Sequence, residues 1–302
     1  MDRVLFDANA EVISSEKEFP ELRSHHQQGL RIGQWSDLQY KQALLDNQRN
    51  YYFPESRKAI SYLPSDFLRS GLFGLSTTIS DEDIVQSFPI YRWDSVDAAV
   101  PGEFIHYSGP RLTQFHKRVL LQIVVLAAGA ENTAELCLEL GSFLVSIGRS
   151  PCTRNRVALA RALGHLASVK GRITKYEGDR GTPFTFLGGL TWVKGSANLL
   201  MSPSFARMLW WSRRTLLPLA MRTPLPDGVA TALMDLFRAA PQPMYGVKAL
   251  ADIWQREPVQ FGRELSGALN RLVDVGFLSG YQRSRGKVHV DVAEYKYYGS
   301  YT

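Results

Sequence analysis

The sequence contains few cysteines and no long apolar segment. Its two cysteines, Cys137 and Cys152, do not form a CxxC pair, which excludes a disulfide scaffold and the usual zinc-binding frameworks. The longest apolar run, at 119–128, covers about ten residues, whereas a membrane-spanning helix needs roughly 18. Acidic residues occupy the N-terminal positions where a secretory signal peptide would be apolar. We therefore expect a cytoplasmic chain without a metal or other cofactor.

Motifs of nucleotide-driven and DNA-cleaving enzymes are also missing. The absence of GxxxxGK[ST] excludes a P-loop ATPase or helicase. A rolling-circle nickase needs two histidines that flank one apolar residue, but His25 and His26 are adjacent. The acidic group Asp81–Asp83 is interpreted as the first turn of a helix, and His116 and His165 as surface residues or residues that support a site. These observations predict that the chain is not an enzyme.

Basic residues are concentrated in the last two thirds of the chain. Residues 1–100 contain 10 lysine or arginine residues against 15 acidic ones, a net charge of −5. Residues 101–302 contain 25 against 14, a net charge of +11. An acidic leader followed by a basic region suggests that a polyanion binds the basic region only.

The hydrophobic pattern predicts one order of elements twice: helix, short helix, longer helix and β-hairpin. The first copy has predicted helices at 113–128, 141–147 and 150–169, a strand at 133–138, and a hairpin of 172–176 and 184–193. The second copy has predicted helices at 227–237, 246–254 and 260–275, and a hairpin of 280–283 and 287–292. This is the order of a winged helix, in which the hairpin is the wing. The predicted fold is therefore α+β, with two tandem winged-helix domains that are mainly helical.

The domain boundaries follow from this repeat. We expect a loosely ordered acidic leader at 1–60, a first winged-helix domain at 61–198, and a second domain at 199–302 that begins with a connecting helix at 202–217. The region around Pro54, Pro64 and Gly71 resembles a connector, and Asp227 is a candidate N-cap of the helix that follows it.

The third helix of the first copy is the strongest candidate for contact with DNA. No acidic residue occurs between Leu140 and Tyr176. Helical spacing predicts a buried face formed by Val157, Ala160, Leu163, Gly164 and Ala167. The opposite, basic face and the adjoining wing supply the first set of predicted DNA-binding residues: Arg154, Asn155, Arg156, Arg161, Arg172 and Lys175. Arginine pairs with guanine and asparagine with adenine in the major groove, and a solvated basic surface is the alternative interpretation.

The second copy repeats the pattern with a more mixed charge. Its third helix is predicted to bury Phe261, Leu265, Ala268, Leu269 and Leu272. The residues that face away, and the basic tip of the hairpin, are the second predicted set: Gln260, Arg263, Ser266, Asn270, Arg283, Arg285 and Lys287. Positive charges at a hairpin tip are suited to phosphate contacts. The acidic residues Glu264 and Asp274 weaken the basic character of the helix, so a solvated surface is the alternative interpretation here as well.

Over residues 63–292 the sequence resembles the plasmid replication initiator family of the TrfA/RepA type. The matching segments are 69–73, 105–109, 136–141, the helix around Leu163, 234–237 and 276–278. The resemblance implies a protein that binds directly repeated origin sites (iterons) as double-stranded DNA, helps to open the origin, and recruits a host replication initiator and the replicative helicase. It also implies an equilibrium between homodimer and monomer. Gln42–Asp46 lacks the aromatic residue of the family's sliding-clamp motif, so clamp binding is not carried over.

The predicted function is therefore sequence-specific duplex binding in plasmid replication initiation and copy control. Three alternatives remain open: a winged-helix transcriptional repressor without initiator activity, a nicking replication enzyme, and a protein-interaction module.

Overall fold

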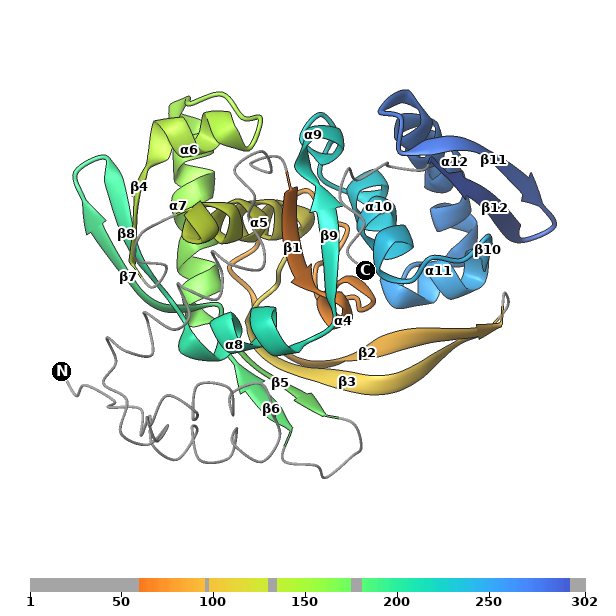
Figure 1. Ribbon diagram of the computed structural model, residues 1–302, viewed down its shortest axis with the longest axis horizontal. Helices are drawn as coiled ribbons and strands as arrows, with labels where there is room; N and C mark the ends of the chain where they lie inside the picture. Colours follow the sequence, from red (N-terminus) through yellow and green to blue (C-terminus); the bar gives the residue numbers. More distant parts are fainter. Residues whose placement is uncertain (1–59, 96–97, 130–134, 175–180, 294–302) are drawn as a thin grey trace, which may run out of the picture.

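The computed structural model describes residues 60–95, 98–129, 135–174 and 181–293. The predicted leader, apart from Ile60, lies outside these residues, as does Lys175. Two similar units occupy the two ends of the long axis, and each carries a β-hairpin at its outer edge (Figure 1).

The first unit, called the first repeat below, contains three helices and a three-stranded sheet. Its elements are α5 (Gln114–Gly129), β4 (Glu135–Glu139), α6 (Leu140–Ser146), α7 (Thr153–Ser168), β7 (Leu187–Val193) and β8 (Ser196–Met201). The strands lie in the order β4-β8-β7, and both pairs are antiparallel. The predicted helices and the strand before α6 are confirmed with small shifts at their ends.

The second repeat has the same elements in the same order. They are α10 (Val229–Ala239), β10 (Met244–Gly246), α11 (Val247–Ile253), α12 (Pro258–Asp274), β11 (Leu278–Ser284) and β12 (Lys287–Val292), with sheet order β10-β12-β11. The hairpins also agree in detail, because pairing shifts register between Leu187 and Gly189 in one and between Leu278 and Gly280 in the other. Positions in one repeat can therefore be compared with positions in the other.

A long four-stranded sheet, absent from the sequence-based expectations, extends the first repeat. It consists of β2 (Asp83–Ser95), β3 (Ala98–Pro110), β5 (Lys170–Thr174) and β6 (Thr182–Phe184), in the order β2-β3-β5-β6. The interpretation of Asp81–Asp83 as a helix start is wrong, since Asp83 begins β2. Figure 1 shows this sheet running below both repeats.

The predicted hairpin of 172–176 and 184–193 is wrong in its pairing. β5 pairs with β6, whereas β7 pairs with β8 and forms the hairpin of the first repeat. Where the chain changes sheets, Phe184 and Phe186 pack into an aromatic cluster, and their ring centroids lie 4.9 and 5.6 Å from that of Phe67.

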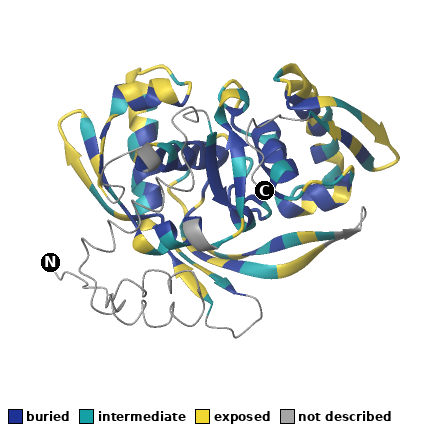
Figure 2. Ribbon diagram, viewed as in Figure 1, coloured by how far each residue is buried: buried dark blue, intermediate teal, exposed yellow. Residues whose placement is uncertain are grey.

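A two-stranded ribbon lies between the repeats. β1 (Ile60–Pro64) pairs with β9 (Arg214–Pro218), and short helices α4 (Ser65–Leu68) and α9 (Leu219–Arg222) follow the two strands. The predicted connecting helix is only partly correct, because α8 (Pro203–Trp211) ends before β9. The interpretation of the segment around Pro64 and Gly71 as a connector is also wrong: this segment is buried in the core (Figure 2).

Gly71 marks a close contact between the two halves of the chain. A Cβ atom at this position would lie 2.3 Å from the carbonyl oxygen of Ile253, at the end of α11. On the same side, the Trp93 ring of β2 meets the ring of Tyr245 edge-on at 5.6 Å. The β2–β3 sheet of the first half therefore packs directly against the second repeat.

Candidate nucleic-acid interface

The exposed face of α7 differs from the predicted one. The helix buries Leu159, Ala162, Leu163 and Leu166 against α5 and the β7–β8 hairpin. Of the predicted buried face, Leu163 is correct, Ala160, Gly164 and Ala167 are half-buried, and Val157 is wrong. Val157 is 56% exposed and lies on the solvent side together with Arg154 and Arg161. The basic face therefore exists, but its centre is an apolar side chain.

Two other predicted residues of α7 have local partners. The side-chain amide of Asn155 donates to the carbonyl oxygen of Ser150 at 2.8 Å and fixes the chain that enters the helix. Arg156 is exposed and lies next to Glu139, whose carboxylate accepts backbone hydrogen bonds from Gly141 and Ser142 at the start of α6. Hydrogen bonding with Ser142 and then Gly141 holds the pKa of Glu139 at about 2. Arg154 is thus the best placed of the four predicted helix residues for contact with bases, while Arg161 is exposed but has its Nε 3.3 Å from Asp81.

A chain of imidazoles fastens α7 to α5. The backbone N–H of Thr113 donates to Nδ1 of His116 at 3.0 Å, and Nε2 of His116 lies 3.1 Å from Nδ1 of His165, with the rings stacked. Nε2 of His165 lies 2.9 Å from Asp81, and Asp81 also contacts Nε of Arg161 at 3.3 Å. The contacts run in one line from the Thr113 N–H through both rings to the Asp81 carboxylate. Of the two expected placements of these histidines, the surface one is wrong, because both side chains are buried and link α7 to α5.

The buried His116 predicts a pH dependence of stability. Burial, and then the neighbouring His165, lower its pKa to about 3 from the ordinary value near 6.5. Between these values the unfolded chain binds more protons than the folded one, so acid destabilises the fold. We expect the free energy of unfolding to fall below pH 6.5, with a contribution of at most about 1.4 kcal/mol per pH unit from this group.

Urea denaturation between pH 7 and pH 4 measures this contribution. His116→Gln should reduce the pH dependence, whereas the control His289→Gln, on the exposed side of β12, should not. An identical pH dependence in His116→Gln and the unaltered protein would contradict the assignment.

The third helix of the second repeat agrees with its prediction. α12 buries Phe261, Leu265, Ala268, Leu269 and Leu272, and Gln260, Arg263 and Asn270 are exposed while Ser266 is half-buried. Its hairpin is fastened to the helix: the Arg283 guanidinium donates to the carbonyl oxygen of Gly262 at 3.0 Å and to the Ser266 hydroxyl. The Tyr281 hydroxyl donates to Oδ1 of Asn270 at 2.7 Å. The hairpin and the helix therefore form one surface.

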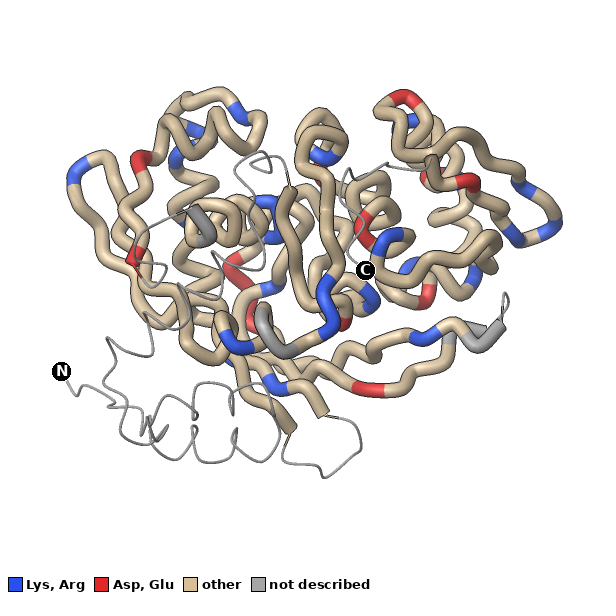
Figure 3. Tube along the Cα trace, in the orientation of Figure 1, with Lys and Arg blue, Asp and Glu red and all other residues tan. Residues whose placement is uncertain are grey.

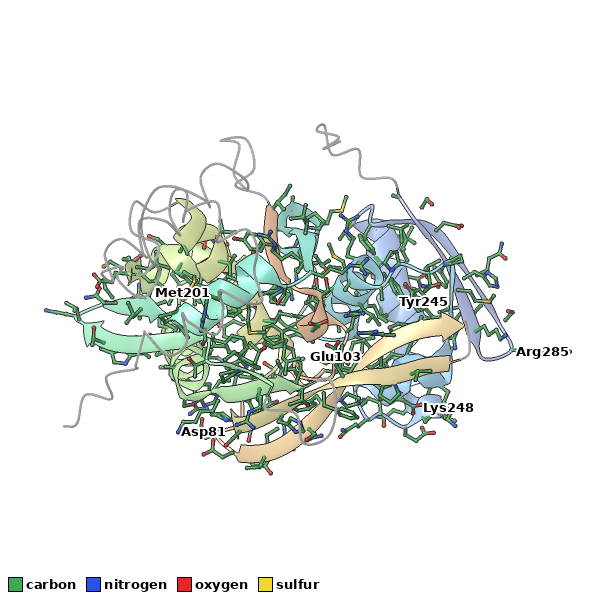
Figure 4. The ribbon with its side chains drawn as sticks, turned by 60° about the horizontal axis from the view of Figure 1, so that its bottom comes forward. Asp81, Glu103, Met201, Tyr245, Lys248 and Arg285 are labelled. Carbon is green, nitrogen blue, oxygen red and sulfur yellow. The ribbon has the colours of Figure 1, made fainter. Side chains whose placement is uncertain are left out.

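The two hairpins present different tips. In the second repeat the turn contains Arg285 and Gly286 in left-handed conformations (φ 27° and 80°), and Arg285 lies at the outer end of the hairpin (Figure 4). Basic residues cluster at this tip (Figure 3). In the first repeat the positions equivalent to Arg283 and Ser284 hold Trp192 and Val193, which are 49% and 57% exposed.

Two residues predicted for the first wing are placed elsewhere or not described. Arg172 is exposed on β5, in the four-stranded sheet rather than in the hairpin of the first repeat. Lys175 lies outside the described residues. The basic character of the first hairpin therefore rests on Lys194 at its turn, a residue that sequence reasoning did not select.

Solved structures match this arrangement, although no known protein family and no curated protein matches the sequence. Domains 2 and 3 of RctB cover 76% of this chain and 98% of their own length, with a TM-score of 0.53 and 12% identity. The Pi initiator protein, solved in complex with iteron DNA, covers 79% of this chain and 99% of its own, with a TM-score of 0.51 and 12% identity. The chain shares the fold of these two solved structures. The resemblance expected from the sequence is confirmed at the level of the fold.

A buried ion cluster joins the two repeats. Asp227 precedes α10 and binds Arg118 of α5 at 2.7 Å as well as Arg149. Asp227 is therefore not the N-cap of α10, a position that Gly228 occupies. Asp235 of α10 lies 2.7 Å from Nζ of Lys117, and Arg222 lies 3.2 Å from the same carboxylate.

The carboxylates of the cluster are held ionised by their cationic partners. Burial alone would raise the pKa of Asp235, but Arg222 and Lys117 outweigh it and hold this pKa below its usual range. Burial lowers the pKa of Lys117 to about 8, against the attraction of Asp235. The side chains of Lys117, Asp235 and Arg222 are each at most 4% exposed. The cluster therefore links the first repeat to the second through buried ion pairs.

The described residues contain no group of three or more His, Cys, Asp or Glu side chains placed to hold a metal ion. No helix among them is long and apolar enough to cross a membrane.

Proposed function

We propose that this chain is a plasmid replication initiator in which both repeats are winged-helix units that bind directly repeated origin sites as double-stranded DNA. The observation that supports this most strongly is the fold shared with the Pi initiator protein, which was solved with iteron DNA. The second support is the exposure of a basic helix face in each repeat, at Arg154 and Arg161 and at Arg263.

In this proposal α7 and α12 enter successive major grooves. Arg154, Arg161 and Arg263 donate to base edges, and Arg285 and its neighbours in the β11–β12 hairpin contact phosphates. Two groove contacts about one helical turn apart span roughly 20 base pairs. The buried ion pairs link α5 to α10 and to the segment before it, and this link supports a fixed spacing of α7 and α12 in the proposal. Origin opening, dimer–monomer exchange and recruitment of a host initiator and helicase belong to the same proposal.

Phosphate contacts predict a steep salt dependence. If about six basic residues neutralise phosphates, the logarithm of the affinity should fall with the logarithm of the salt concentration at a slope near −5. Arg285→Ala should weaken binding to all duplexes by similar factors and reduce the slope by about 1. Fluorescence anisotropy with a selected and a scrambled duplex measures both quantities. The control Arg92→Ala, on β2 where Arg92 pairs with Glu103, should leave the slope unchanged; an unchanged slope in Arg285→Ala would argue against the hairpin contact.

A plasmid assay separates an initiator from a repressor. A plasmid that carries the repeats beside the coding region, and no other origin, should be maintained only when this chain is expressed. Loss of the plasmid despite tight binding would favour the repressor. Incubation with supercoiled origin DNA and Mg²⁺ tests the nicking enzyme, for which a relaxed product would be diagnostic. Failure to bind any DNA at low salt would instead favour a protein-interaction module.

A further inference from the structure

Val157 occupies an unusual position for an exposed apolar side chain. It is 56% exposed on α7, one turn from both Arg154 and Arg161, on the face that the proposed function places in the major groove. Packing of α7 does not require an apolar residue here, because the buried face is formed by Leu159 and its helical neighbours on the other side.

Comparison of the repeats identifies the equivalent residue in α12. Both helices contain Leu-x-x-Ala-Leu-x-x-Leu, at 159–166 and at 265–272, and the four apolar residues of each motif are buried. In this register Val157 corresponds to Arg263, which is exposed and is a predicted base-reading residue. The first repeat thus has an apolar side chain where the second has a guanidinium.

The surface beside Val157 allows close approach of a ligand. On the C-terminal side, Gly164 has open space around the position of a Cβ atom, with nothing within 4 Å. Ala160, between the two, has only a methyl group. A small-residue face of this kind lets the helix approach the base edges, and the apolar feature available in the major groove is the 5-methyl group of thymine.

We propose that Val157 is a specificity-determining residue that contacts the 5-methyl group of one thymine in the DNA half-site read by α7. The inference rests on the proposed function and adds to it: the first repeat selects thymine by an apolar contact, at the position where the second repeat uses Arg263.

The test replaces thymines by deoxyuridine, which removes only the methyl group. A duplex of about 20 base pairs is first selected from a random library by the full chain, and each thymine is then replaced in turn. At one position the unaltered protein should lose affinity by about fourfold, the effect of one buried methyl group. Val157→Ala should bind the thymine duplex several-fold more weakly and should no longer distinguish thymine from deoxyuridine at that position.

Controls separate this inference from the proposed function. Val85→Ala removes an 89% exposed valine from β2 and should keep the full thymine preference. Circular dichroism of Val157→Ala should match that of the unaltered protein. If a sequence is selected but no thymine preference depends on Val157, the inference fails while the proposed function stands. If the chain selects no sequence, the proposed function fails and the inference with it.

Discussion

Replacing Asp235 by alanine should lower the free energy of unfolding by about 3–5 kcal/mol. This carboxylate is fully buried between Lys117 and Arg222, which have at most 4% exposure. Removal of one partner from a buried ion pair leaves the other charge without compensation in a medium that solvates it poorly. Here two cations would lose their shared anion, so the effect should be among the largest that a single substitution causes in this chain.

Urea denaturation of the full chain at pH 7 measures this effect. The matched control is Asp291→Ala, on the exposed side of β12, for which a change within about 0.5 kcal/mol is expected. A loss of less than about 1 kcal/mol in Asp235→Ala would show that the cluster does not hold the repeats together. Combined replacement of Asp235 by leucine and Lys117 by methionine should recover part of the loss, because one uncompensated charge is then also removed.

Replacing Arg154 or Arg263 by alanine should weaken binding to the selected duplex by about 1–3 kcal/mol, or roughly 5- to 150-fold. Both side chains are exposed on the outer faces of their helices, so their loss should not affect folding. An arginine that binds guanine through two hydrogen bonds loses both with the side chain. The sequence preference should relax at one base position for each variant.

Anisotropy titrations on selected and scrambled duplexes distinguish base contacts from phosphate contacts. The scrambled duplex should show a much smaller loss than the selected one for Arg154→Ala and for Arg263→Ala. The control Arg92→Ala lies on the four-stranded sheet and should affect neither duplex. Equal losses of affinity for both duplexes would show that the two arginines contact the phosphate backbone and not the bases.

The two helices show how far the sequence alone could predict the site. The buried face of α12 was predicted correctly because large apolar residues recur at helical spacing and polar residues fill the remaining positions. In α7, alanine, glycine and valine are spread around the helix, so two different faces are apolar enough to be the buried one. The repeated Leu-x-x-Ala-Leu-x-x-Leu motif was the signal that could have decided between them and exposed Val157.

Long-range pairing explains most of the remaining differences. β1 pairs with β9, at least 150 residues further along the chain, and local periodicity carries no information about such a partner. The sequence could not predict the buried ion cluster either, because Lys117, Arg118 and Asp227 are of residue types that usually lie on a solvated surface. Their burial depends on the docking of the second repeat against α5, which is a property of the assembled fold.

The central claim is that two copies of one DNA-binding unit, held at a fixed distance, read adjacent segments of a single duplex. A hydroxyl-radical footprint of the full chain on the selected duplex tests it directly, with Arg154→Ala and Arg263→Ala beside the unaltered protein. The account predicts two protected segments about one helical turn apart, with weaker protection in one segment for the first variant and in the other segment for the second. A single protected segment, or loss of protection in the same segment for both variants, would contradict it.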